Sequence, residues 1–310
     1  RLGPFPFASF WGPRAGLPST GWIAGAASAV LEGPDPPDLL LAYLPHLDYD
    51  FQRFGPGHAD ARDRIREVDS VAGALVEKAR SQGFGVLVVS EYGLEDVDRA
   101  VLPNLALREA GLLEVRETPF GEMLEPGSSR AFCVCDHQIA HVHLREDQEE
   151  GPIREILATL PGVAAFASGT DRADIGLDHP RAGNAVLLAE HGSWFAYPYW
   201  LDAADAPDFA RTVDIHRKPG YDPCELFLDP ALVAPRLRVA RRLMASRLGF
   251  RTLFDVIPLD TSLVRGSHGL LPADPSQGPL VLASEPGLLP DDRDDLPMGI
   301  VRALMIDATS

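Results

Sequence analysis

The chain has 310 residues, of which 45% are hydrophobic, enough for one large α/β domain or for a core with a small second domain. Its 45 acidic and 28 basic side chains give a formal net charge of −17, which disfavours binding to the phosphate backbone of a nucleic acid polymer. No stretch of about 18 apolar residues predicts a membrane span, and the 3 cysteines predict no disulfide framework and a reducing, cytoplasmic location.

The N-terminal elements are predicted from capping signals and apolar runs. Ser19 with Thr20 is a typical N-terminal cap for a helix over 21–32. The continuous apolar run at 38–44 is typical of a buried parallel strand. Ligands of open α/β sheets bind beyond the carboxyl ends of the strands, so Asp48, which follows this run, is a candidate site residue.

A long helix and a second strand follow. Apolar residues recur at helical spacing over 59–81, and Gly83 is a typical helix end. The apolar run at 85–90 predicts another buried strand, which leads directly to Glu91. Strand–helix–strand units cross over with a right hand, so we expect Asp48 and Glu91 at the same edge of the sheet, where one cation can bind both carboxylates.

The rhythm of the elements changes near residue 130. After a predicted helix at 104–110, the chain shows, in order, a strand-like run at 131–144, a helix at 153–160 and strands at 162–167 and 185–189. This order predicts a small α+β cap. His137, His141 and His143 share one face if 131–144 is a single strand. They are then either metal ligands or part of the packing of the cap, and packing is the preferred interpretation.

The C-terminal half contains an aromatic, proline-rich region at 190–230, which we expect to be a packed loop, and a basic helix at 232–249. Asp214 and His216 alternate, so they share one face of an extended segment, where they can bind a metal ion. The neighbouring Arg217 or Lys218 can bind a substrate phosphate. The alternative for this segment is a loop held by salt bridges.

Three short segments far apart in the chain each present a metal-ligand type of residue. They are Leu44-Pro45-His46-Leu47-Asp48, Ser90-Glu91-Tyr92-Gly93 and Gly266-Ser267-His268-Gly269. Their order and spacing resemble the alkaline phosphatase superfamily, in particular its type I phosphodiesterase/nucleotide pyrophosphatase branch. The resemblance implies an α/β fold with an alkaline-phosphatase-like, mostly parallel sheet and helices on both faces. This core would span 1–128 and 250–310, with a small α+β cap and the aromatic loop region inserted at 129–249.

The resemblance also implies a set of metal ligands. Asp48 and His268 fall on metal-binding Asp and His positions, whereas Gln52 stands where the family has His. Glu91 replaces an Asp and Tyr92 replaces a His. The change to Gln52 supplies an amide oxygen in place of an imidazole nitrogen, which moves the preference from Zn²⁺ toward Mg²⁺, Mn²⁺ or Ca²⁺. Asp214 and His216 can replace the lost imidazole.

By this resemblance the chain is expected to be a metal-dependent phosphoric-ester hydrolase of the phosphodiesterase/nucleotide pyrophosphatase type. It would use one or two divalent ions (Zn²⁺, Mn²⁺ or Mg²⁺) and a small phosphorylated substrate; no oligomeric state is predicted. The family's Thr or Ser nucleophile precedes the first motif, so the catalytic nucleophile is expected upstream of Arg1. The alternatives are a catalytically impaired member that binds a phosphorylated or anionic ligand, and a sulfatase or phosphomutase-like relative.

Overall fold

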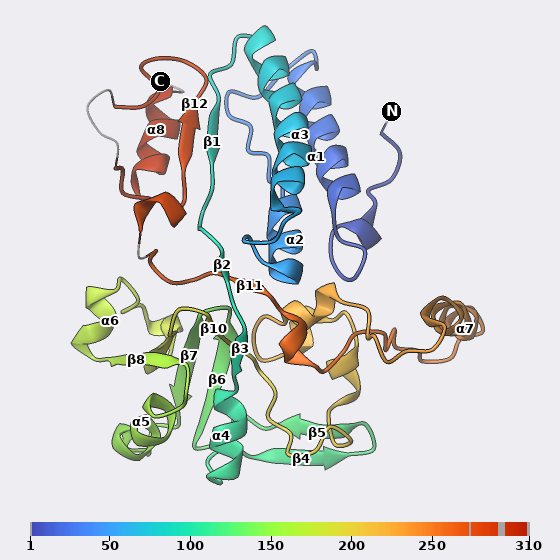
Figure 1. Ribbon diagram of the computed structural model, residues 1–310, viewed down its shortest axis with the longest axis vertical. Helices are drawn as coiled ribbons and strands as arrows, with labels where there is room; N and C mark the ends of the chain where they lie inside the picture. Colours follow the sequence, from blue (N-terminus) through green and yellow to red (C-terminus); the bar gives the residue numbers. More distant parts are fainter. Residues whose placement is uncertain (1, 273, 291–294, 309–310) are drawn as a thin grey trace. The chain divides into compact units, whose positions relative to one another are not determined.

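The computed structural model describes residues 2–272, 274–290 and 295–308, without the side chain of Ala308 (Figure 1). The chain forms two compact units. The first comprises Arg1–Phe51, Gly57–Leu94 and Pro272–Ser310, and the second comprises Gln52–Pro56 and Glu95–Leu271. These units are defined by contacts within the chain, whereas the predicted division into 1–128 with 250–310 and 129–249 concerns an inserted cap and stays a prediction.

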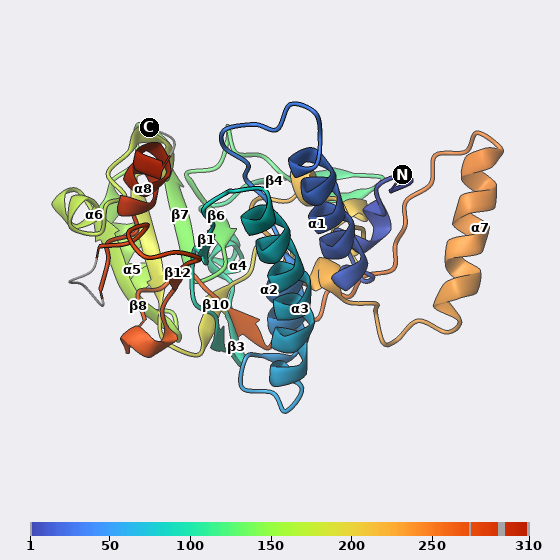
Figure 2. The same cartoon turned by 90° about the horizontal axis from the view of Figure 1, so that it is seen from above.

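Two helices that lie side by side dominate the first unit, α1 (Leu17–Leu31) and α3 (Ala61–Ser81), as Figures 1 and 2 show. The helix expected at 21–32 begins earlier, because Pro18 fits the first helical turn, where its missing N–H is not needed. The helix expected at 59–81 is confirmed, and Gly83 follows it with φ +85°. A 3₁₀ turn, η1 (Phe7–Ser9), precedes α1, and α2 (His46–Phe54) lies between the two.

The strands of the first unit form a short antiparallel pair, β1 (Leu87–Val89) with β12 (Val281–Ala283). The predicted strand at 38–44 is wrong: the segment has no ladder partner among the described residues, and Leu41 is 73% exposed. An apolar run forms a strand only where a neighbour pairs with its backbone. The predicted crossover to β1 is therefore absent. The unit also contains η7 (Pro275–Gln277) and α8 (Ile300–Ala308).

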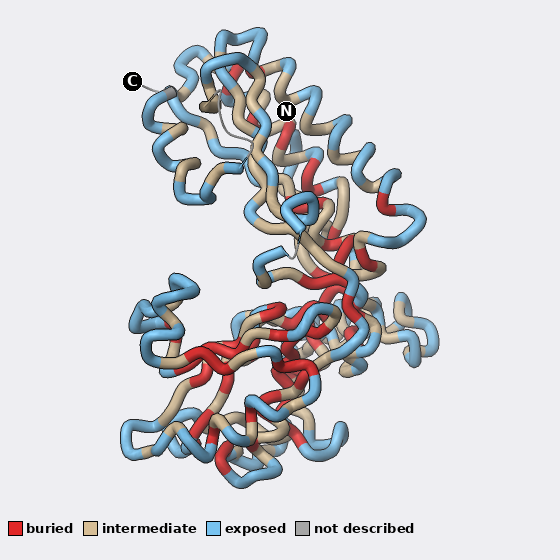
Figure 3. Tube along the Cα trace, turned by 60° about the vertical axis from the view of Figure 1, so that its left-hand side comes forward, coloured by how far each residue is buried: buried red, intermediate tan, exposed pale blue. Residues whose placement is uncertain are grey.

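A four-stranded antiparallel sheet forms the centre of the second unit. Its strands, in spatial order, are β6 (Ala131–Asp136), β7 (Ile139–Leu144), β9 (Ala185–Ala189) and β8 (Val163–Ser168). The helices α4 (Pro103–Glu109) and α5 (Glu150–Ala158) pack beside it. Figure 3 shows that buried positions gather in this unit's strands. In chain order these elements run strand–strand–helix–strand–helix–strand, and the inserted α+β cap stays a prediction.

One detail of this sheet corrects the sequence interpretation. Residues 131–144 are not a single strand but a hairpin, with a turn at His137, whose φ is +55°. His137 therefore lies in the turn and does not share a strand face with His141 and His143. A non-glycine residue with positive φ is uncommon, so the sequence gives little warning of this turn. Nearby, Cys133 and Cys135 are buried on β6 and, like Cys224, are free thiols.

Shorter elements surround the sheet. The paired strands are β2 (Glu95–Asp96) with β11 (Gly266–Ser267), β3 (Arg99–Val101) with β10 (Ser193–Phe195), and β4 (Val115–Thr118) with β5 (Gly121–Leu124). The remaining helices are α6 (Thr170–Asp174), η2 (Pro180–Ala182), η3 (Asp208–Arg211), η4 (Ile215–Arg217), η5 (Pro223–Leu226), α7 (Pro235–Arg247) and η6 (Thr261–Leu263). Among the described strands only β3 and β10 pair in parallel, so the mixed α/β class is confirmed and a mostly parallel sheet is not.

The aromatic region after β9, predicted as a packed loop, is well packed but also contains the strand β10 and the turns η3, η4 and η5. Six of its aromatic side chains are buried: Trp194, Phe195, Tyr197, Tyr199, Trp200 and Phe209. Five of them join the core formed by the sheet and α4, whereas Trp194 packs in a smaller cluster with Val97, Cys224 and Val264. Across the described residues, none of the helices combines the length and the apolar character needed to cross a membrane.

Candidate functional site

The first group of candidate residues lies in the first unit, around Asp48. Asp48 stands in the first turn of α2 rather than after a strand, which corrects the expected strand-end position. An aspartate in the first turn is favoured there by the partial positive charge of the helix N-terminus. The hydroxyl of Tyr92 donates a hydrogen bond to Asp48 Oδ1 at 3.2 Å. The structure therefore joins two of the predicted metal-site residues.

Glu91 and Tyr43 complete this group. Burial, followed by the charge of Asp48, raises the pKa of the Tyr92 phenol, and the charge of Glu91 adds to this effect. The pKa of Tyr43 is also raised, first by burial and then by Asp48 and Glu91, although a hydrogen bond with Tyr92 partly offsets this. The group thus combines two carboxylates with two phenols that stay neutral. Neutral phenols are poor metal ligands but good hydrogen-bond donors to carboxylates.

The second group lies in the second unit and contains Gln52 and His268. The Gln52 side chain is fully buried, and its Oε1 accepts a hydrogen bond of 2.9 Å from the Tyr221 hydroxyl. The Tyr221 ring stacks on the His137 imidazole, with centroids 4.2 Å apart. The His137 imidazole in turn lies 3.7 Å, centroid to centroid, from that of His268. Tyr221 and His137 therefore connect two residues predicted to bind metal.

Backbone contacts fix this stack. The backbone N–H of Gln138 donates to the His268 carbonyl at 2.9 Å, so the β6–β7 turn holds the chain at His268 in place. The Nδ1 atom of His137 lies 3.3 Å from the Ser267 hydroxyl. Burial lowers the pKa of His268 to about 4. Burial and the neighbouring His268 hold the pKa of His137 well below its usual range. Both imidazoles are therefore neutral near pH 7, the form that binds metal ions.

The third group of predicted residues follows η3 and forms ion pairs. Asp214 precedes η4 and accepts from Arg217 Nε at 3.0 Å, while His216 is exposed on the same turn. Asp214 and His216 therefore lie on a 3₁₀ turn rather than on one face of an extended segment. The buried Lys218 ammonium lies 2.7 Å from both Asp222 and Glu225. This geometry matches the alternative of a salt-bridged loop; the metal and phosphate roles stay predictions.

Sequence reasoning missed the residues that connect the predicted ones. Tyr43 lies in the apolar run that was expected to be a strand, and Tyr221 follows the Lys218-Pro219-Gly220 segment without a metal-ligand pattern. His137 was considered as a metal ligand or a packing residue on a single strand, and not as part of a turn. No turn pattern marks this hairpin, because two-residue hairpin turns usually contain glycine and His137-Gln138 does not.

The groups differ in their metal-binding potential. Within the described ranges, no cluster of three or more His, Cys, Asp or Glu side chains has the arrangement of a metal site. Asp48 and Glu91 belong to the first unit and His268 to the second. Their convergence on one cation is therefore a prediction.

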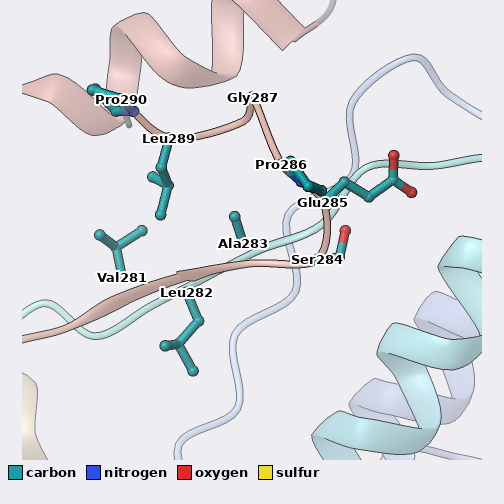
Figure 4. A pocket seen from close by; sticks show the side chains of 9 residues that line it. All are labelled: Val281, Leu282, Ala283, Ser284, Glu285, Pro286, Gly287, Leu289 and Pro290. Carbon is teal, nitrogen blue, oxygen red and sulfur yellow. The ribbon is translucent and has the colours of Figure 1, made fainter. Parts of the chain in front are cut away.

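The first unit also has a cavity whose lining includes none of these candidate residues. It has a volume of about 420 Å³ and is lined by β12 and the loop that follows, from Val281 to Pro290 (Figure 4). Its lining is largely apolar, and the Glu285 carboxylate points away from Val281 and Leu289. Since the lining residues that the structure describes include no imidazole or cationic group, we assign it no role in phosphate chemistry.

Comparison with known proteins places these observations in context. Residues 8–222 match the family model described as type I phosphodiesterase / nucleotide pyrophosphatase. A curated relative, an uncharacterized pyrophosphatase/phosphodiesterase of Schizosaccharomyces pombe, is 35% identical over 68 residues, which are 21% of this chain and 14% of that protein.

Solved structures give weaker matches. Murine ectonucleotide pyrophosphatase/phosphodiesterase 5 is 14% identical, with a TM-score of 0.43 over 59% of this chain and 45% of that chain. Phosphonoacetate hydrolase from Sinorhizobium meliloti 1021, solved with phosphonoformate, is 15% identical, with a TM-score of 0.41 over 58% of this chain and 43% of that chain. This chain thus spans less than half the length of each of these proteins.

Proposed function

Because this chain belongs to the type I phosphodiesterase/nucleotide pyrophosphatase family, we propose that it acts as a metal-dependent phosphoric-ester hydrolase. Its substrate would be a small molecule with a phosphodiester or pyrophosphate bond. The observation that carries this proposal is the family match over 8–222, which contains Asp48, Gln52, Glu91 and Tyr92. His268 lies beyond the matched range and enters the proposal through its motif and its neutral imidazole.

The donor set suits a divalent cation. We propose Asp48 and Glu91 as carboxylate ligands and His268 as the imidazole ligand, with Gln52 as an amide oxygen donor. Carboxylate and amide oxygens with few imidazoles favour Mg²⁺ or Mn²⁺ over Zn²⁺ at physiological availability. When bound, the cation would polarise a phosphoryl oxygen and stabilise the charge that develops in hydrolysis.

The remaining residues have supporting roles in this proposal. Tyr92 stays neutral and donates to Asp48, which fixes the orientation of the carboxylate. The half-exposed guanidinium of Arg217 is the better candidate for a substrate phosphate, since Lys218 is buried between two carboxylates. Asp214 and His216 would serve as ligands only if Gln52 does not.

A second candidate function is the binding of a phosphorylated ligand without its hydrolysis. Two observations favour it. Tyr92 occupies a family His position and donates to Asp48, and the Gln52 oxygen already accepts from Tyr221. Both contacts occupy groups that would otherwise face a metal ion.

Hydrolysis of bis(p-nitrophenyl) phosphate, measured with metal analysis of the purified protein, separates the two candidates. Catalysis predicts that this chain binds a divalent metal and that Asp48→Asn or His268→Asn abolishes this binding. Turnover, measured in a protein that also supplies the family's nucleophile, should be abolished by a chelator and by the same two changes. The same substitutions at two exposed positions, Asp69→Asn and His179→Asn, are matched controls and should leave activity unchanged. Phosphate-ester binding without metal or turnover would support the second candidate, and absence of both would refute the two together.

A further inference from the structure

The region around α7 is positively charged, whereas the chain as a whole is negatively charged. Residues 231–254 contain six arginines and no acidic residue, in a protein whose formal net charge is −17. In Figures 1 and 2, α7 stands apart from the sheet of its own unit and is joined to it by extended segments. The helix buries none of its residues and makes no extensive contact with another helix or strand in the described part of the chain.

An apolar stripe runs along the free side of α7. Leu237, Met244 and Leu248 follow helical spacing, and they are 63%, 61% and 71% exposed. The exposed side chains of Val233 and Phe250 extend the apolar surface beyond the two ends of the helix. A surface helix usually turns its apolar stripe toward the core. Here the three side chains are exposed, as is Leu243 on another side of the helix, and exposed apolar surface of this kind can mark a binding site.

The arginines divide into two sets around this stripe. Arg238 and Arg242 both bind Asp255, with Arg242 Nη2 2.8 Å from Oδ2, and they anchor the helix to its own unit. At 3.6 residues per turn, Arg241 borders one side of the stripe, and Arg236 and Arg247 border the other. These three are exposed, and among the described residues no ion pair involves them.

We propose that α7 binds the surface of an anionic lipid bilayer. The stripe would enter the boundary between headgroups and acyl chains, and Arg236, Arg241 and Arg247 would contact lipid phosphates on both sides. This is the arrangement of an amphipathic helix that lies in the plane of a membrane. The acidic remainder of the protein opposes binding only weakly, because charges beyond about 8 Å are largely screened at physiological ionic strength.

A lipid surface fits these observations better than a protein partner. Protein interfaces depend on central aromatic anchors that enter pockets on the partner. The stripe has aliphatic and thioether side chains along its whole length, and its one aromatic residue, Phe250, lies beyond the end of the helix. Flexible apolar side chains flanked by arginines suit a fluid surface without fixed pockets.

Sedimentation with vesicles tests the proposal. The full chain should bind vesicles of phosphatidylcholine with phosphatidylserine, bind less at high salt, and not bind phosphatidylcholine alone. Replacing Arg236, Arg241 and Arg247 together by Gln should weaken binding by about 100-fold or more, since each arginine near an anionic surface contributes about fivefold. The same change at Arg62, Arg66 and Arg80, exposed on α3, is the matched control and should leave binding nearly unchanged.

A second measurement reads out insertion of the stripe. The native thiols are buried, so a polarity-sensitive thiol label reacts selectively with a cysteine introduced by Met244→Cys or by Ser246→Cys on the other side of α7. Vesicles should shift the emission of the label at 244 to the blue and leave the label at 246 nearly unchanged. Absence of vesicle binding, equal loss in the α3 control, or a stripe-dependent self-association without vesicle binding would overturn the lipid assignment.

Discussion

Replacing Lys218 by Met tests whether this residue holds the second unit together. The chain has two lysines, Lys78 and Lys218, as the sequence shows. Lys218 is buried, with its ammonium 2.7 Å from Asp222 and 2.7 Å from Glu225. The substitution keeps the length and the apolar stem of the side chain but removes the charge. Two buried carboxylates then lose the ammonium group between them.

The expected loss is large because the partners cannot move into water. Removing one member of a buried ion pair typically lowers the free energy of unfolding by about 3–5 kcal/mol. The exposed ion pair of Lys78 with Glu32 provides a matched control. Lys78→Met should lower the free energy of unfolding by less than about 1 kcal/mol. The double variant Lys218→Met, Glu225→Gln should recover part of the lost free energy of unfolding, because the second change removes one of the two buried negative charges.

Urea unfolding monitored by tryptophan fluorescence measures these differences, since Trp194 and Trp200 are buried in the same unit as Lys218. If Lys218→Met unfolds at the same urea concentration as the wild type, the buried ion pair does not hold the unit together. If it retains stability but loses affinity for a phosphate ester, Lys218 binds substrate instead, as the sequence alone allowed.

Three further predictions follow from the second unit. Because the pKa of His268 is lowered to about 4, its contribution to stability should be complete above about pH 6.5 and fall as the pH drops toward 4, and the His268 ring resonances should show no titration near pH 6.5 in NMR spectra. Gly220→Ala should lower the free energy of unfolding in urea by about 3 kcal/mol or more, because the added Cβ would collide with the backbone of Cys135. Gly111→Ala, where the added Cβ meets open space, should lower it by only about 1–2 kcal/mol. Equal losses in the two variants would contradict the contact with Cys135. Gln52→His should tighten Zn²⁺ binding by about tenfold or more in calorimetric titration if Gln52 is a ligand, and equal affinities would point to His216 as the next residue to mutate.

Local patterns predicted the elements that depend on local interactions. The α3 helix follows from its periodic apolar residues and terminal glycine, and β9 follows from its short apolar run. The run at 38–44 has equally strong strand character, yet it forms no strand, because pairing depends on a neighbour that the run itself does not specify. For the same reason the apolar pattern of 131–144 predicts one strand, although the structure has a hairpin there.

The candidate site was predictable only residue by residue. Motif resemblance selected Asp48, Tyr92, Gln52 and His268, and the structure joins them in two pairs. Tyr92 contacts Asp48 directly, whereas Tyr221 and His137 connect Gln52 to His268. Contacts between residues so far apart in sequence leave no local pattern. The position of Asp48 in a helix rather than after a strand could not be predicted either, since His46 to Phe54 follows a run that resembles a strand.

The pairing of β1 with β12 has a consequence for how the chain acquires its structure during synthesis. Leu87 is paired with Ala283, so the first unit cannot complete this strand pair until the chain as far as Ala283 has left the ribosome. The sheet of the second unit is built from hairpins and near neighbours between Ala131 and Ala189, and such contacts form early and rapidly. We therefore expect the second unit to fold first. Until β12 has been synthesised, the apolar segment of β1 is unpaired and can bind chaperones or aggregate.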